Sequence, residues 1–226
     1  MNLIQLIWFF SIYSLFGWIW ETIYLSIKYK KFIDTGFLKG PFCPLYGSCS
    51  IITIIFLSPL TSNLVLFYIF AVILATTLEY ITSILVEILF KIKFWDYSDD
   101  FKLNFQGRVA LVVSLFWGLL LVTLIKFIHP QISLLINKIP SPYLEVGAII
   151  IVPYFVLDTI FSTISLFGLK KILKTIKSIP KDFKEFRRHQ IHFFKAFPQI
   201  SSSKFNLIKD ISQKINTKIS KTSSES

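Results

Sequence analysis

The chain has 226 residues, of which 54% are hydrophobic, 17% aromatic and only 16% charged. A soluble domain has about 45–50% apolar and about 25% charged residues, so this composition excludes a disordered chain, a disulfide-rich secreted module and an ordinary soluble enzyme. The formal net charge of +11 would indicate nucleic-acid binding in a soluble protein, but here its meaning depends on where the basic residues lie.

Five hydrophobic segments predict an all-α, polytopic transmembrane helical bundle. They cover approximately 3–27, 45–60, 64–90, 109–128 and 146–167. A helix that spans a bilayer needs about 20 apolar residues, and the second segment is shorter than this. The first segment follows no basic region and ends without a small-residue cleavage site, so we interpret it as a retained helix rather than a signal peptide.

The basic residues are divided unequally between the two sides of this predicted bundle. The connections after the first and third segments, together with the tail, hold 22 of the 24 Lys and Arg residues. By the positive-inside rule, the N-terminus lies outside and the C-terminus in the cytosol. We therefore expect a multi-pass protein of the bacterial cytoplasmic membrane. It would have a transmembrane domain over 1–168 and a basic cytosolic tail over 169–226.

The tail differs from the rest of the chain in its pattern of residues. From residue 169, Leu and Ile recur at helical spacing with Lys on the opposite face, which predicts a basic amphipathic helix lying on anionic lipids of the inner leaflet. The Ser-rich end of the chain predicts partial disorder.

The connection between the first two segments, residues 32–47, is rich in Gly and Pro and cannot form a regular helix. It is nevertheless largely apolar, and irregular backbone at membrane depth is tolerated only inside protein or beside a wet cavity. Two interpretations stay open: a re-entrant segment that lines a site, and a cytosolic loop whose aromatic residues dip into the interface. The residues that define this motif are Gly36, Gly40, Pro41, Pro44, Tyr46 and Gly47.

Two blocks of the sequence resemble the signature of one bacterial membrane family. The first block contains F-G-W-I-W-E at 16–21 and G-P-F-C-P-L-Y-G at 40–47, and the second contains W-D-Y-S at 95–98 and N-F-Q-G-R at 104–108. Over about residues 1–170 the chain resembles the family named putative ABC transporter permease, type IV (CmpB-like). The resemblance implies a permease-like transport component. The chain has no Walker A motif, so an ATPase would be a separate subunit.

Acidic residues inside the predicted spans are candidates for a substrate or ion site, because ionisable groups are expensive to place in lipid. At 1.5 Å of rise per residue, Glu79 and Asp158 lie near the midplane, and Glu21 lies closer to the cytosolic end. Two acids at one depth would share a proton or hold a cation. The alternative is that each is protonated by burial and hydrogen-bonded to a neighbouring Ser, Thr or Tyr.

Arg108 is the only Arg outside the tail of a chain that otherwise uses Lys. Because Arg makes planar, bidentate contacts that Lys cannot make, we hypothesise that it pairs with Glu21 or Asp96. The alternative is a simple positive-inside anchor. Asp96 itself either belongs to the site or caps a short turn that leads to Asn104.

The leading prediction is therefore an integral membrane transport component with its site between the first, third and fifth segments and the Gly/Pro connection. Two alternatives stay open: a membrane-embedded enzyme acting on lipid, although no H-E-x-x-H or G-x-S-x-G motif is present, and a non-catalytic regulatory or assembly protein. We predict no catalytic residues, cofactor, metal site or nucleic-acid partner. The expected partners are the lipid bilayer and anionic inner-leaflet lipids, with a separate ATPase subunit and self-association as further alternatives.

Overall fold

The computed structural model describes residues 1–90 and 93–175. Within them, five helical stretches are long and apolar enough to cross a bilayer: Leu3–Tyr29, Pro44–Ser62, Leu64–Phe90, Leu111–Lys138 and Ser141–Phe167. The prediction of an all-helical protein with five apolar helices is confirmed. Most of the predicted tail lies outside the described residues, so its amphipathic helix stays a prediction, as does the orientation of the chain in the membrane.

In chain order, the described elements are helices except for one short hairpin of two strands. The first half holds α1 (Leu3–Tyr29), α2 (Pro44–Ile52), the π-helix η1 (Thr53–Leu57), the 3₁₀-helix η2 (Ser58–Ser62) and α3 (Leu64–Phe90). The second half holds β1 (Asn104–Phe105), β2 (Val109–Ala110), α4 (Leu111–Thr123), the π-helix η3 (Leu124–Ile128), α5 (His129–Lys138) and α6 (Ser141–Thr175).

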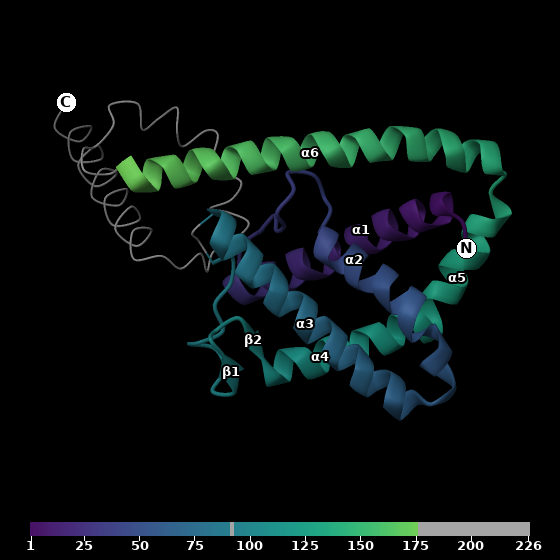
Figure 1. The fold of residues 1–226 in the computed structure, drawn as a ribbon, viewed down its shortest axis with the longest axis horizontal. Helices are drawn as coiled ribbons and strands as arrows, with labels where there is room; N and C mark the ends of the chain where they lie inside the picture. Colours follow the sequence, from purple (N-terminus) through teal and green to yellow (C-terminus); the bar gives the residue numbers. More distant parts are fainter. Residues whose placement is uncertain (91–92, 176–226) are drawn as a thin grey trace.

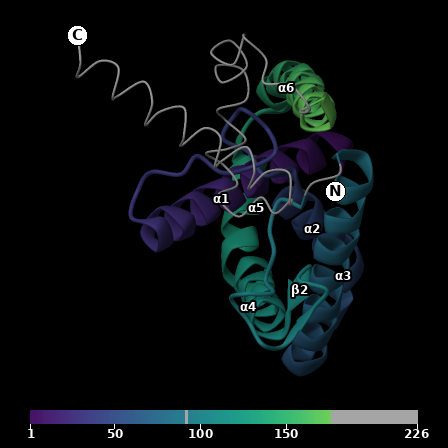
Figure 2. The same cartoon turned by 90° about the vertical axis from the view of Figure 1, so that its left-hand side faces the viewer.

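The helices pack as two pairs with a fifth helix laid across them. In Figure 1, α3 lies beside α4 and α2 lies beside α1, while the long α6 extends past one edge. The view turned by 90° shows α6 almost end-on, with α1 crossing beneath it and with α3 and α4 running away from both (Figure 2). The buried core lies where α1, η1, α3 and α4 meet, and includes Phe9, Tyr13, Phe67, Ala71 and Leu121.

The residues at the N-terminal ends of α1 and α2 explain why these two helices begin where they do. Asn2 caps α1 because its side-chain oxygen accepts the N–H of Gln5 at 2.8 Å, while the Gln5 side chain accepts the N–H of Asn2 at 3.0 Å. This reciprocal capping box satisfies two donors that a helix leaves free. Pro44 begins α2, where its missing N–H costs nothing and its fixed φ suits the first turn.

The second and fourth spans are longer than the sequence suggested, because non-α turns extend them. The second continues through η1 and η2 to Ser62. The fourth passes through η3 into α5 and ends at Lys138, so residues 129–138, which lie between the fourth and fifth predicted segments, are helical. Pro130 cannot donate to the preceding turn, and a π-helix immediately before it adjusts the hydrogen-bond register without ending the helix.

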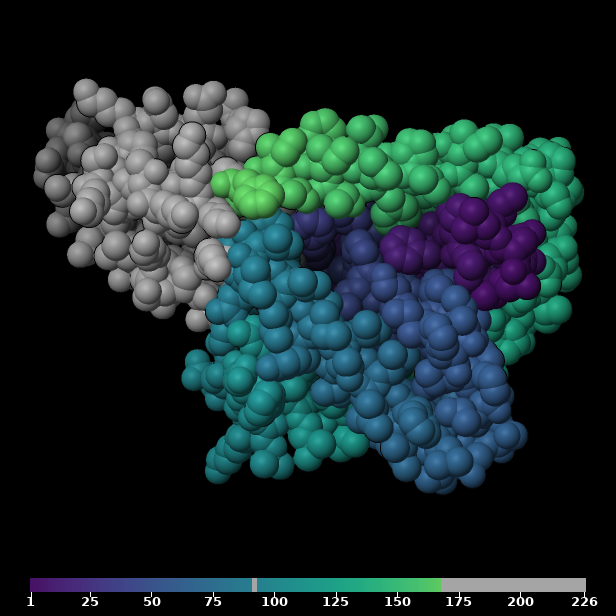
Figure 3. Space-filling model, viewed as in Figure 1, coloured from purple at the N-terminus to yellow at the C-terminus, as the bar shows by residue number. Residues whose placement is uncertain are grey.

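The helix α6 touches the rest of the protein along a narrow strip. It packs mainly on α1 and leaves an apolar groove of about 480 Å³ whose walls include Phe10, Ile51 and Phe155. Figure 3 shows the three helices that form this groove on one face, with α1 in purple, α2 in blue and α6 in green. The broad remaining surface of α6 is covered by exposed Ile, Val, Leu and Phe side chains, as lipid contact requires.

Gly17 provides a test of the packing between α1 and α2. A Cβ atom at this position would collide with the ring of Tyr46, so Gly17→Ala forces Tyr46 out of its place. We expect a loss of about 1–3 kcal/mol, the usual cost of overpacking, measured as a lower thermal-unfolding midpoint of the detergent-solubilised protein. Ile19→Ala, on the exposed side of the same helix, is the control. Equal stability of the two variants would contradict the observed packing.

Candidate functional site

Two acidic side chains from different helices face the same interior region. Glu79 of α3 is only 6% exposed. The Tyr97 hydroxyl donates to its Oε1 at 2.8 Å, and its other oxygen, Oε2, is buried with no hydrogen-bond partner among the described residues. Glu21 of α1 lies close enough to Glu79 for the two carboxylates to repel each other. The structure therefore brings these two acids together, whereas the sequence favoured Glu79 with Asp158.

The Glu21 carboxylate is surrounded by groups from the Gly/Pro connection and the start of α2. The Cys43 thiol donates to Glu21 Oε2 at 3.6 Å, and Thr35 and Tyr46 lie beside the same carboxylate. Burial first, and then the charge of Glu21, raises the pKa of the Cys43 thiol well above its ordinary value. The thiol is therefore a neutral donor and not a reactive thiolate.

Aromatic side chains from three elements close the region around Glu79. Tyr46 of α2 and Trp117 of α4 pack edge to face, with ring centroids 5.3 Å apart, and the Trp117 indole lies beside the Glu79 carboxylate. Tyr97 completes the enclosure from the connection between α3 and α4. We call Glu21, Glu79, Tyr46, Tyr97 and Trp117 the acidic cluster.

Tyr97 reaches Glu79 because the two sequence motifs of the second block fold into one unit. The N–H of Tyr97 donates to the carbonyl of Gly107 at 2.8 Å, and the Trp95 indole donates to the carbonyl of Arg108 at 2.8 Å. Gly107 has a φ of +68°, which favours glycine, and its N–H donates to Asn104 Oδ1 at 2.9 Å. The predicted site residue Asn104 thus shapes the hairpin to which the backbone of Tyr97 is bonded.

The Tyr97 hydroxyl acts as a donor towards Glu79. Burial, and after it the neighbouring Glu79, raises the pKa of Tyr97 well above its ordinary value, so the hydroxyl keeps its proton. Sequence reasoning selected neither Tyr97 nor Trp117, although Tyr97 lies in a motif that carried the family resemblance. The signal for Tyr97 was the position of an aromatic residue beside a polar turn, which an interfacial belt would also produce.

Asp96 organises the turn in front of Tyr97. Its carboxylate accepts the N–H of Ser98 at 3.0 Å and the Lys93 ammonium at 3.2 Å. Burial raises the pKa of Asp96, but the hydrogen bonds from Ser98 and the attraction of Lys93 outweigh it, so the pKa lies below its ordinary value. Asp96 is therefore charged and engaged within the turn, as the capping interpretation expected.

Arg108 forms an ion pair with Glu87, and neither of its hypothesised partners is the group that it contacts. Its Nη2 lies 2.6 Å from Glu87 Oε2, its Nη1 donates to Ser83 at 3.3 Å and its Nε donates to Gln106 at 3.2 Å. The pairing with Glu21 or Asp96 was wrong because Ser83 and Glu87, four residues apart, lie on one face of α3, and the hairpin places Arg108 against that face.

Asp158 holds the Gly/Pro connection against α6 and does not belong to the acidic cluster. Its two carboxylate oxygens accept the backbone N–H groups of Lys39 at 3.0 Å and Gly40 at 2.9 Å, and Ser162 donates to it at 3.3 Å. A Cβ atom at Gly40 would collide with the Tyr154 hydroxyl. Glycine is therefore required here for the backbone to reach the helix.

The middle of the Gly/Pro connection is buried inside the protein, whereas Phe32, Lys39 and Pro41 are exposed. Ile33, Thr35 and Leu38 are at most 1% exposed. The chain turns at Gly36, whose φ is +108°, and is tied back where the N–H of Cys43 donates to the carbonyl of Ser14 at 2.9 Å. Burial in protein satisfies one condition for irregular backbone at membrane depth. Whether the segment is re-entrant stays a prediction.

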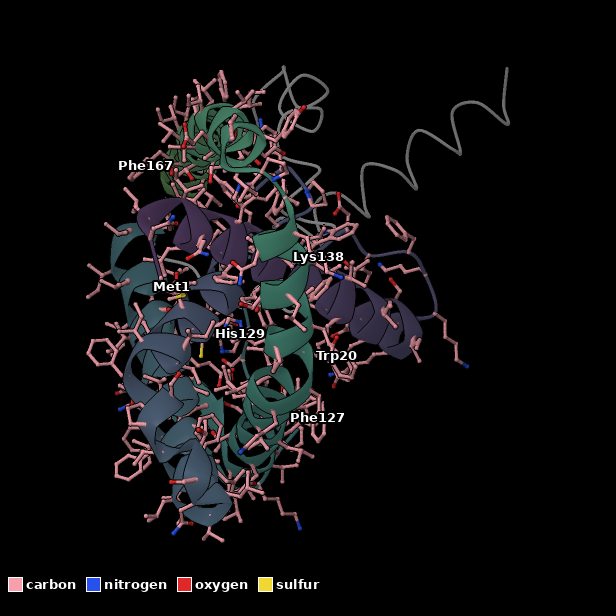
Figure 4. The ribbon with its side chains drawn as sticks, turned by 90° about the vertical axis from the view of Figure 1, so that its right-hand side faces the viewer. Met1, Trp20, Phe127, His129, Lys138 and Phe167 are labelled. Atoms are coloured by element: carbon pink, nitrogen blue, oxygen red, sulfur yellow. The ribbon has the colours of Figure 1, made fainter. Side chains whose placement is uncertain are left out.

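A second polar contact inside the bundle also escaped the sequence analysis. The Tyr13 hydroxyl lies 2.7 Å from His129 Nδ1, and His129 projects from the start of α5 towards α1 (Figure 4). Phe9 packs edge to face on the same imidazole, with centroids 4.8 Å apart. This contact joins α1 to α5 and has no acidic partner in the part of the chain that the structure describes.

Five helices that are long and apolar enough to cross a bilayer define a polytopic helical membrane protein, and α1, α2, α3 and α4 each supply a side chain of the acidic cluster. The family model described as "Putative ABC-transporter type IV" matches residues 8–163, and the chain belongs to this family. The resemblance identified from the two sequence blocks is thereby confirmed. No curated protein and no solved structure matches the chain.

The hydrogen bonds to Asp158 should protect backbone amides of the Gly/Pro connection from hydrogen–deuterium exchange. Asp158→Ala removes the acceptors for the Lys39 and Gly40 amides, so we expect faster hydrogen–deuterium exchange in peptides that cover residues 36–43. Glu145→Ala, at an exposed position of the same helix, is the control and should leave these peptides unchanged. Unaltered exchange in Asp158→Ala would show that the connection is held by other contacts.

The Arg108–Glu87 ion pair can be measured by a double-mutant cycle. Arg108→Lys keeps the charge but loses the fork that reaches Glu87 and Ser83 together. We expect this variant and Glu87→Gln to be non-additive, with a coupling of about 1 kcal/mol in unfolding free energy, because Glu87 is partly exposed and solvent screens the pair. A coupling near zero, with unchanged expression of Arg108→Lys, would support the anchor interpretation.

Proposed function

We propose that the chain is the permease-like transmembrane subunit of a transport system in the bacterial cytoplasmic membrane. Its N-terminus would lie outside and its C-terminus in the cytosol. The acidic cluster would be the site that meets the transported or coupled species. The family match supports a transport role, and the 22 basic residues on one predicted side support the orientation.

The observation that carries this proposal is the convergence of Glu21 and Glu79 inside the helices. A structural protein gains nothing from two carboxylates that repel each other in a low-dielectric interior, and ionisable residues there mark substrate or ion pathways. Neither acid forms an ion pair with any residue that the structure describes. The positive charge that would balance the pair is therefore not supplied by the described residues.

The elements around the pair are suited to movement. The span that contains α2 changes from α- to π- to 3₁₀-helix over residues 53–62, and breaks of this kind mark functional hinges. From the connection between α3 and α4, the Tyr97 hydroxyl donates a hydrogen bond to Glu79. In this proposal the discontinuous span and the hairpin open the cluster in turn to the two sides of the membrane.

The energy source would be a separate ATPase subunit, because the chain lacks a phosphate-binding loop of the Walker A type. The predicted cytosolic side, with its basic connections and tail, is where such a subunit would dock.

The test is to purify the tagged chain from native membranes with its bound subunits and reconstitute the complex in liposomes. We expect ATP hydrolysis that depends on this chain and falls at least tenfold in Glu79→Gln. The reason is that a substrate site without the negative charge of Glu79 cannot complete the transport cycle. Glu145→Gln, outside the cluster, is the control and should keep full activity.

Two other results would overturn the proposal. Lipid turnover by the pure chain, lost in Glu79→Gln, would assign a membrane-embedded enzyme. Full activity after Glu21 and Glu79 are both replaced by Gln would leave a regulatory or assembly role.

A further inference from the structure

Two buried oxygen atoms in and beside the acidic cluster have no hydrogen-bond partner among the described residues. They are Glu79 Oε2 and the hydroxyl oxygen of Thr35, a side chain that is fully buried beside Glu21. The Tyr97 hydroxyl donates to the other Glu79 oxygen and the weak Cys43 thiol donates to Glu21, while the Tyr46 hydroxyl and the Trp117 indole lie beside the two carboxylates as further donors. Buried polar atoms without partners are costly, so oxygen atoms left in this state indicate that a positively charged ligand belongs there.

The walls of the cluster also suit a cation. Tyr46 and Trp117 pack edge to face beside the carboxylates, and a carboxylate attracts a cation more strongly in a desolvated site than in water. No Lys or Arg among the described residues pairs with Glu21 or Glu79. The positive charge that the site lacks is therefore not supplied by the described part of the protein.

The charge and ligand set limit the kind of cation. Within residues 1–90 and 93–175, no group of three or more His, Cys, Asp or Glu side chains is arranged to hold a metal ion, which disfavours the transition metals that prefer nitrogen and sulfur ligands. Carboxylate and hydroxyl oxygens favour a hard or hydrogen-bonding cation. Tyr97 already stabilises one carboxylate, so a single positive charge is enough to compensate the other.

We propose that Glu21, Glu79 and Thr35 bind one compact monovalent cation, either an alkali ion or a small protonated amine, between α1 and α3. This rests on the proposed function, because the cation would be the species that the subunit transports or uses for coupling. Glu79 Oε2 supplies the oxygen that has no partner among the described residues, Glu21 supplies the second carboxylate, and Trp117 lies beside Glu79, close enough to report on binding.

The experiment measures equilibrium binding to the full chain in detergent. Labelled Na⁺ and labelled methylammonium are the two probes, and N-methyl-D-glucamine chloride, which is too large for a compact site, keeps the ionic strength constant. We expect saturable binding of one of the probes with a stoichiometry near one per chain, together with a saturable change in tryptophan fluorescence that Trp117→Phe abolishes. Which probe binds distinguishes the alkali ion from the amine.

The variants locate the site. Glu79→Gln and Glu21→Gln keep the shape of the side chain and one acceptor oxygen, for Tyr97 and for Cys43 respectively, but lose the charge, so each should weaken binding at least tenfold. Glu87→Gln, which changes the acid paired with Arg108 outside the cluster, should bind as the wild type does. The wild-type measurement decides the matter even if a variant misfolds: if neither probe binds saturably, or if both variants bind normally, the proposal is wrong.

Failure of this inference and failure of the proposed function give different results. A chain that binds a cation at the cluster but copurifies with no ATPase keeps the cation site and loses the ABC-type role. A chain whose ATPase complex depends on Glu79 but binds neither probe keeps the transport role and loses the monovalent cation as its ligand.

Discussion

The structure depends on how one irregular stretch of backbone satisfies its hydrogen bonds away from water. A segment rich in Gly and Pro cannot bond to itself as a helix does, and unpaired N–H and C=O groups in lipid cost several kcal/mol each. The connection between α1 and α2 meets this constraint with partners from both neighbouring helices: Ser14 and Ser26 of α1 and Asp158 of α6. These bonds fix the start of α2, and the start of α2 fixes Tyr46 and Cys43 beside Glu21.

The helices were predictable because a run of apolar residues along the chain is enough to indicate a membrane-spanning helix. Runs of apolar residues identified α3 almost to the residue, and Asn2 and Pro44 stand where helix starts are expected. The extensions were not predictable in the same way. A proline normally ends a helix, and only the neighbouring η3 turn shows that Pro130 is accommodated within a longer span. The β1–β2 hairpin is too short to have a periodicity.

The contacts of the charged residues were harder to predict because sequence gives depth but not direction. Counting residues places Glu79 and Asp158 at similar depth, yet their side chains have different neighbours. Asp158 accepts hydrogen bonds from the Gly/Pro connection, whereas Glu79 lies near Glu21. Arg108 was correctly marked as unusual, but its partner depended on the fold of residues 93–110. That fold follows from the φ of Gly107 and from tight turn contacts whose geometry the residue types alone do not set.

The connection between α3 and α4 links the surface of the protein to its interior. Asp96, Asn104 and the Trp95–Arg108 bond hold residues 95–108 together, and this unit contacts α3 through Arg108 on Ser83 and through the Tyr97 hydroxyl on Glu79. A protein or lipid that displaced the unit at the membrane surface would therefore also shift the hydrogen-bond donor of Glu79. In this way a contact made at the surface would change the surroundings of a carboxylate that lies within the helices.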